Sequence, residues 1–135
     1  MAAIEDAIYT RLSGFSGLTA LTSTRIYPGE LPPNVNIDED FPDSVVYFPV
    51  SGERISAMGS DTGLVRERFQ FDGWSRTYDG ANAIREQLRL ALQRWRGTVA
   101  TVVIQDTFIV GRHYRFDAVA ALHGAGHDAM INYEE

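Results

Sequence analysis

The chain lacks cysteine and lysine, and each absence removes a class of chemistry. Without cysteine there are no disulfides, no thiolate metal sites and no cysteine nucleophiles. Without lysine there is no glycine-rich phosphate-binding loop of the kind that ends in lysine. The twelve basic residues are all arginine, which can reflect genome composition but also suits protein interfaces through its planar, weakly hydrated guanidinium group.

Long apolar runs and an excess of positive charge are also missing. No run of about eighteen apolar residues occurs, and the first residues, "MAAIEDAIYT", carry acids where a secretory signal carries basic residues. We therefore expect a protein made and kept in the cytoplasm, without membrane contact. The net charge of -6 argues against a protein whose main work is to hold a phosphate backbone.

The composition fits one ordinary domain over residues 1–135. Of these residues 44% are apolar and 22% are charged, which is enough apolar material for a core that folds alone. Apolar residues at helical spacing predict an N-terminal helix over 3–14, with a further helical turn and a short extended piece after it. The segment at about 29–43 is rich in proline and acids, and it predicts a long exposed loop that is a candidate for interactions.

The middle of the chain predicts a long β-hairpin. The segments "SVVYFPVSGERI" (44–55) and "LVRERFQFDGW" (64–74) are rich in β-forming residues, and the small residues of 56–63 connect them at an exposed tip. Pro49 cannot donate to a ladder, so it predicts an edge strand or a bulge. Alternation along the return strand predicts one face with Val65, Glu67, Phe69 and Phe71, and another with Arg66, Arg68, Gln70, Asp72 and Trp74.

A longer helix and two strands are expected after the hairpin. Ser75 and Thr77 are plausible N-caps, and an apolar stripe runs from Ile84 to Trp95 before Gly97. The segment 98–116 is β-rich with a bend near Gly111, and 126–135 predicts a last strand. The fold class is therefore α+β: a mainly antiparallel sheet with a long β-hairpin, backed by an N-terminal helix and a longer central helix.

One tripeptide indicates catalysis. "DTG" at 61–63 matches the motif in which aspartic proteases present their catalytic acid, and "FIVGRHY" (108–114) is similar to the segment that supports this loop in retroviral-type proteases. In those enzymes the motif follows an apolar strand, whereas Asp61 follows the polar "SAMGS". A helix also occupies the place of the glycine-rich flap. A small aspartic protease stays as the alternative from another functional class.

The remaining motifs indicate no metal, no cofactor and no enzyme. His123 and His127 have a spacing found in helical metal sites, but the intervening "GAG" disfavours a helix and no third ligand is near in sequence. Together with His113 they are interpreted as surface or structural histidines. "GFSGL" has Leu18 where a nucleophile elbow needs glycine.

Five segments along the chain together indicate a family: "IEDAIYTRLS", "RIYP", "VVYFPVSGERI", "GLVRERFQFDGW" and "TYDGANAIREQLRLAL", in this order. Together they resemble the tail terminator (tail completion) proteins of long-tailed phages and gene transfer agents. No single piece is a diagnostic signature, so the specificity lies in their order. The resemblance weakens after Trp95, and the acidic, proline-rich segment before Ser44 departs from the usual pattern.

This resemblance implies a structural virion assembly protein. Such a subunit forms a ring with copies of itself, commonly a hexamer, at the head-proximal end of the tail tube. There it ends polymerisation of the major tail tube protein and provides the docking face for a head-tail connector or head completion protein. DNA passes through the lumen without specific binding. The expected location is the virion tail, after assembly in the host cytoplasm, and a head-tail connector of similar fold is a second alternative.

The hairpin is the expected contact with the next subunit or the tube. Its edge can pair with a neighbouring strand, and its tip can become ordered on contact. The candidate interface residues are Glu53, Arg54, Met58, Ser60, Asp61, Arg66, Arg68 and Gln70.

Overall fold

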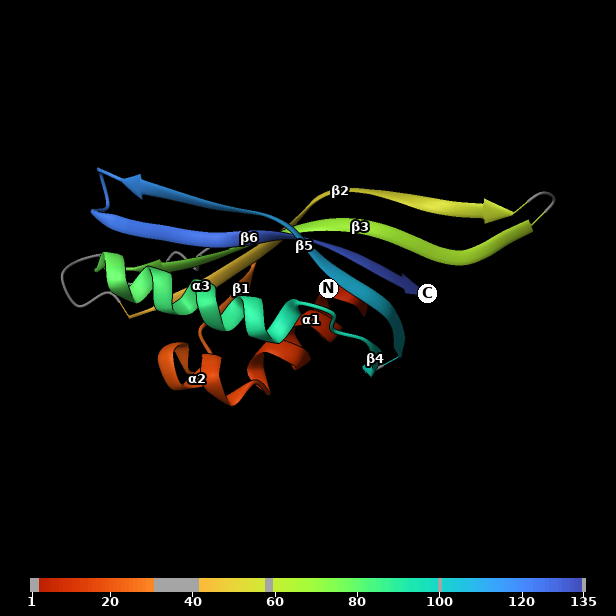
Figure 1. Ribbon diagram of the computed structural model, residues 1–135, viewed down its shortest axis with the longest axis horizontal. Helices are drawn as coiled ribbons and strands as arrows, with labels where there is room; N and C mark the ends of the chain where they lie inside the picture. The colour runs from red at the N-terminus through yellow and green to blue at the C-terminus, as the bar shows by residue number, and fades with distance from the viewer. Residues whose placement is uncertain (1–2, 31–41, 58–59, 100, 135) are drawn as a thin grey trace.

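A computed structural model describes residues 3–30, 42–57, 60–99 and 101–134 (Figure 1). Three helices lie on one side of a six-stranded sheet with the strand order β1-β2-β3-β6-β5-β4. The elements are α1 (Ala3–Ser13), α2 (Ser16–Thr22), β1 (Ile26–Pro28), β2 (Ser44–Ala57), β3 (Ser60–Ser75), α3 (Tyr78–Leu92), β4 (Gly97–Val99), β5 (Val102–Asp117) and β6 (Leu122–Glu134). The predicted α+β class, with its long hairpin and two backing helices, is confirmed.

Four long strands, β2, β3, β6 and β5, form the body of the sheet, and each is antiparallel to the next. The short β1 is parallel to the beginning of β2, and the short β4 is antiparallel to the beginning of β5. In Figure 1 the β2–β3 hairpin extends past the helices on the right, and the β5–β6 hairpin reaches the opposite end on the left. The two hairpins therefore give the molecule two different ends.

Several predicted boundaries are corrected by backbone pairing. The hairpin strands continue into the segment predicted as a tip, because Ser56 pairs with Asp61 and Ala57 with Ser60. Met58 and Gly59 lie outside the described residues, as does most of the predicted loop at 29–43. β6 begins at Leu122, earlier than predicted, because the pairing with β5 extends that far.

The central helix ends before the predicted position. α3 stops at Leu92 because Gln93 leaves helical geometry and Arg94 has a left-handed φ of 61°. Trp95 is nevertheless buried, so its apolar character reflects core packing beyond the helix. At the other end the prediction is confirmed: Thr77 is the N-cap, and its hydroxyl accepts a hydrogen bond of 3.0 Å from the Gly80 N–H.

The core fills the space between the helices and one face of the sheet. Val65, Phe69 and Phe71 of β3 are buried on this side, as their alternation predicts. α3 contributes Ile84, Leu88, Ala91 and Leu92. The helix comes close to the sheet at Gly73, where a Cβ would lie 2.7 Å from the Cβ of Ile84. Glu67 shares the apolar face and accepts a hydrogen bond of 2.8 Å from the Tyr133 hydroxyl.

His127 lies on this helix-facing side and makes stability depend on pH. It is 5% exposed, and its ring Nε2 is 3.1 Å from the Arg85 carbonyl oxygen. Burial lowers the pKa of His127 below the ordinary value. The unfolded state therefore binds a proton at His127 more readily than the folded state does. The contribution of neutral His127 to stability is fully present above a pH of about 6.5, and it is lost as the pH falls toward the folded pKa.

We expect urea unfolding between pH 8 and 5 to give a free energy of unfolding that falls below about pH 6.5, by at most about 1.4 kcal/mol per pH unit for this one proton. The His127→Gln variant is expected to remove that part of the slope, because its side chain does not titrate. An unchanged slope in the variant would show that other groups cause the acid sensitivity.

Candidate functional site

In the described part of the chain, the sheet offers one uncovered face and two free edges. The open face is the side of the sheet without helices, and it carries the row from Arg66 to Trp74 of β3. On β2, pairing with β1 ends at Tyr47, so residues 48–57 form a free edge among the described residues. On β5, the Arg94 N–H donates to the Thr107 carbonyl, and the Ile109 N–H donates to the Gln93 side-chain oxygen. These bonds leave 110–117 as the second free edge among the described residues. We call these the β2 edge and the β5 edge.

Both free edges contain a β-bulge with an exposed valine. The ladder shifts between Pro49 and Ser51 on β2, and between Ile109 and Gly111 on β5. Val50 is 50% exposed and Val110 is 49% exposed. The prediction that Pro49 marks an edge strand or a bulge is confirmed on both counts, and the predicted bend near Gly111 corresponds to the β5 bulge.

The structure brings most of the predicted hairpin residues with described side chains together on the open face. Glu53 and Arg66 are cross-strand partners, with Arg66 Nη1 3.5 Å from Glu53 Oε1. Arg66 Nε also donates to Asn132 at 3.2 Å. Arg54 is exposed on the helix-facing side. Of the other candidates, Met58 lies outside the described residues, and only the backbone is described for Ser60 and Asp61.

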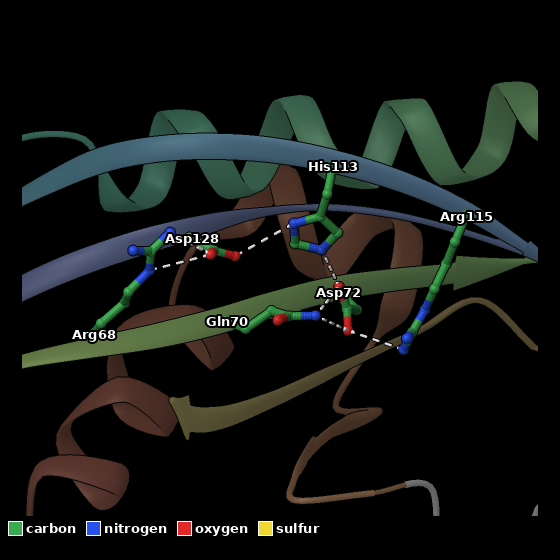
Figure 2. A network of polar contacts seen from close by, with 6 residues as sticks. All are labelled: Arg68, Gln70, Asp72, His113, Arg115 and Asp128. Carbon is green, nitrogen blue, oxygen red and sulfur yellow. Dashed lines mark hydrogen bonds and ion pairs between the residues drawn. The ribbon is translucent and has the colours of Figure 1, made fainter. Parts of the chain in front are cut away.

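Arg68 and Gln70 belong to a polar network that sequence reasoning did not find (Figure 2). Arg68 Nη2 donates to Asp128 Oδ2 of β6 at 2.8 Å, and Gln70 Nε2 donates to Asp72 Oδ2 at 3.1 Å. From β5, His113 Nε2 contacts Asp72 Oδ1, and His113 Nδ1 lies 3.3 Å from Asp128 Oδ1. The network therefore joins β3, β6 and β5 by side chains as well as by their ladders.

Asp72 is the centre of the network. Although it lies in the polar row of β3, it is only 1% exposed. Arg115 also contributes, because its Nη2 lies 3.6 Å from Asp72 Oδ2. The Arg115 guanidinium stacks over the Trp74 ring, 5.0 Å from the ring centroid. A buried carboxylate needs hydrogen bonds or opposite charge, and the chain supplies both.

Two glycines of β6 make this network possible. Asp72, Gly126 and His113 are in register across three strands, and so are Trp74, Gly124 and Arg115. Because β6 has no side chain at these positions, groups from β3 and β5 meet above it. A signal was present in "HGAGH", where the glycines alternate with period two, although the expected strand began only at the second of them.

We expect Asp72→Asn to lower the free energy of unfolding by about 2 kcal/mol, because hydrogen bonds to a charged group are lost at a buried position. In a double-mutant cycle, His113→Gln should cost less in the Asp72→Asn background than in the wild type. Urea unfolding measures both. Glu86→Gln is the matched control, since the exposed Glu86–Arg89 pair of α3 should barely matter. Additive effects of Asp72→Asn and His113→Gln would contradict a direct coupling.

A groove of about 610 Å³ opens on the helix-facing side where the β2–β3 hairpin leaves the body. Its apolar lining comes from Ile4, Val65, Val102 and Tyr133, and its charged lining on this side of the sheet from Glu5, Arg54 and Glu67. Glu53 also borders it, but the Glu53 carboxylate pairs with Arg66 on the open face. Two carboxylates against one guanidinium make this groove acidic.

The pairing separates the two pieces of the protease motif. Gly111 is opposite Asp128, which is opposite Gln70, nine residues along β3 from Asp61. At about 3.3 Å per residue this is a distance of roughly 30 Å. The segment similar to the protease support therefore does not lie against the "DTG" tripeptide.

Metal and membrane sites are not found in the described part of the chain. No group of three or more His, Asp or Glu residues with metal-ligand geometry occurs among residues whose placement is described. Within the same residues, no helix combines the length and apolar character needed to cross a membrane.

Comparison with known proteins places this fold. The chain is similar to one chain of the virion of a native gene transfer agent (GTA) particle, with a TM-score of 0.80 and 16% sequence identity over 98% of this chain and 96% of that chain. No curated protein sequence gives a match. The sequence model described as tail completion protein gp17 matches residues 6–133. The chain therefore belongs to the tail completion protein gp17 family, a family of structural phage tail proteins.

Proposed function

We propose that copies of this chain join through their sheet edges into a ring, commonly of six, at the head-proximal end of a tail tube. The ring ends polymerisation of the tube protein and provides the docking face for the head. Its work is done by interfaces, without catalysis. The observation that carries this proposal is the pair of free edges on opposite sides of one antiparallel sheet.

The strand directions suit a ring. β2, β3, β6 and β5 alternate in direction, so β2 and β5 run antiparallel to each other. A second copy with its sheet facing the same way would present its β5 edge antiparallel to the β2 edge of the first. Each contact would then extend the alternating pattern, and a head-to-tail contact of this kind gives a closed ring when the rotation closes.

The open face suits the lumen of such a ring. Helices cover the other face, so a ring of continued sheets would keep them outside. The described arginines of β3 and β5 on the open face are paired: Arg66 with Glu53, Arg68 with Asp128 and Arg115 with Asp72. Neutralised guanidinium groups have little charge left for phosphates, which supports a lumen through which DNA slides without specific binding.

The proposed partners follow from the same geometry. The β2–β3 hairpin extends beyond the body, so it can reach the major tail tube protein, and the remaining end of the ring would meet a head-tail connector or head completion protein. Assembly would take place in the host cytoplasm before the tail joins the head. A head-tail connector of similar design differs in its partner, since it would bind heads without tails.

The test combines native mass spectrometry with negative-stain imaging of the purified chain, alone and with isolated tail tubes. We expect annular particles on one end of the tubes and tubes that no longer elongate. A chain that stays monomeric with tubes present would overturn the proposal. Binding to tail-less heads but not to tubes would favour the connector instead.

Asp61→Asn separates the structural function from the protease. We expect rings and tube termination to be unchanged in this variant. A proteolytic activity of the wild type that disappears in Asp61→Asn would contradict a purely structural protein.

A further inference from the structure

An exposed aromatic cluster lies at the end of the molecule opposite the β2–β3 hairpin. It consists of Tyr78 at the start of α3, Tyr114 and Phe116 of β5, and His123 of β6. Tyr78 and Tyr114 have ring centroids 5.3 Å apart, and Phe116 and His123 4.8 Å apart. Tyr78, Tyr114 and Phe116 are 54%, 44% and 50% exposed, respectively. Aromatic surface of this kind is typical of the centre of a protein interface.

The hairpin next to the cluster is held in one conformation. Asp117 Oδ1 accepts hydrogen bonds from the N–H groups of Val119 and Ala120 at 3.0 and 3.2 Å. From the other side, Arg76 Nη1 donates to the Ala120 carbonyl at 2.8 Å. Val119 at this turn is 99% exposed. A turn ordered in this way loses little entropy on binding, so its exposed apolar groups are ready for a partner.

The cluster lies on the helix-facing side of the sheet. Tyr114 pairs with Ala125, which in turn pairs with Gly73, and Gly73 faces Ile84 of α3. The acidic groove at the base of the β2–β3 hairpin opens on the same side. The cluster belongs to the β5 edge and the groove to the β2 edge, so an edge-to-edge contact between two copies would bring them together.

We propose that the aromatic cluster of one copy packs into the acidic groove of the next copy, and that this contact, together with the strand pairing, holds neighbouring subunits together. This inference rests on the proposed ring. The rings would pack on the apolar lining of the groove, beside the Glu67 side chain that lies over Gly52. Arg112, exposed on the same face of β5 as Tyr114, would meet the carboxylate of Glu5.

Charge and shape favour a second copy as the occupant. The whole chain is acidic, so two copies repel each other overall. The cluster, however, has Arg112 beside it and the groove has an excess of carboxylates, so these two surfaces attract each other. Because the cluster and the groove lie at different ends, the contact is head-to-tail. Two copies in contact therefore keep one free cluster and one free groove, to which further copies can bind.

The test uses two variants that each remove one half of the contact. The cluster variant carries Tyr114→Ser and Phe116→Ser, and the groove variant carries Thr101→Trp, which places a large ring at an exposed position of the groove. Leu90→Ser on α3, with a side chain of similar exposure, is the matched control. Urea unfolding checks that all variants are folded.

Each variant alone is expected to lower the fraction of ring, measured by native mass spectrometry with tail tubes present, by about tenfold or more, whereas the control assembles normally. Mixed in equal amounts, the two variants should form 1:1 dimers, because one intact cluster then meets one intact groove. Rings from the folded cluster variant, or a mixture without dimers, would overturn this inference and leave the ring proposal standing. A wild type that forms no ring would overturn the ring proposal itself.

Discussion

The Gly126→Ala variant is expected to lose at least about 3 kcal/mol of stability. A Cβ at this position would collide with the carbonyl oxygen of Phe71 and lie 2.8 Å from its carbonyl carbon. Backbone of a central strand cannot move aside without breaking its ladder. The methyl group would also stand between Asp72 and His113, whose side chains meet above this glycine.

Urea unfolding of Gly126→Ala measures this loss, and Gly111→Ala is the matched control. Gly111 is also a strand glycine, on the neighbouring β5, but a Cβ there would meet no heavy atom within 4 Å. We expect Gly111→Ala to change stability by less than about 1 kcal/mol. Equal losses in the two variants would mean that strand glycines matter here through general flexibility, and not through the close approach of Phe71.

The Val110→Lys variant is expected to abolish ring formation and leave the monomer folded. Val110 is 49% exposed at the bulge of the β5 edge, so lysine can reach water without disturbing the core. A charged group on a free edge disfavours pairing with another strand, since its desolvation would accompany every contact. Ring formation with tail tubes, followed by negative-stain imaging, is the measurement, and we expect on the order of a hundredfold fewer rings.

Leu90→Lys provides the comparison for this variant. Leu90 is 47% exposed on α3, so both substitutions place one new charge at equally accessible apolar positions. We expect Leu90→Lys to assemble like the wild type, because the proposed contacts use the sheet edges. Normal rings from Val110→Lys would exclude the β5 edge from the subunit contact, and loss of rings from both variants would point to a general effect of charge.

Much of the fold could be predicted because local patterns agree with the final structure. The period of two in Val65, Phe69 and Phe71 matches their burial, and the helical stripe from Ile84 to Leu92 matches the face of α3 that covers the sheet. The stripe appeared to continue to Trp95 because burial, and not helical geometry, places an apolar residue there. Periodicity reports which residues are buried, so it cannot locate a helix end that depends on the backbone.

The polar network could not be predicted for a different reason. Asp72 lies at an alternating polar position, which normally indicates water. Its burial depends on His113 and Arg115, about forty residues away in sequence, and on β6 lying between them. Strand order is a long-range property that single-strand patterns do not contain. The free edges were only partly predictable, because Pro49 marks one edge and no residue type marks the other.

The place of β6 in the sheet has a consequence for how the subunit is made. β6 follows the other strands in the chain, yet it lies between β3 and β5. During synthesis the β2–β3 and β4–β5 hairpins therefore emerge as separate units, and one sheet forms only when β6 inserts between them. Contacts of such long sequence separation form late. A nascent subunit thus has no pair of edges held at a fixed spacing, so it could join the proposed ring only after β6 has left the ribosome.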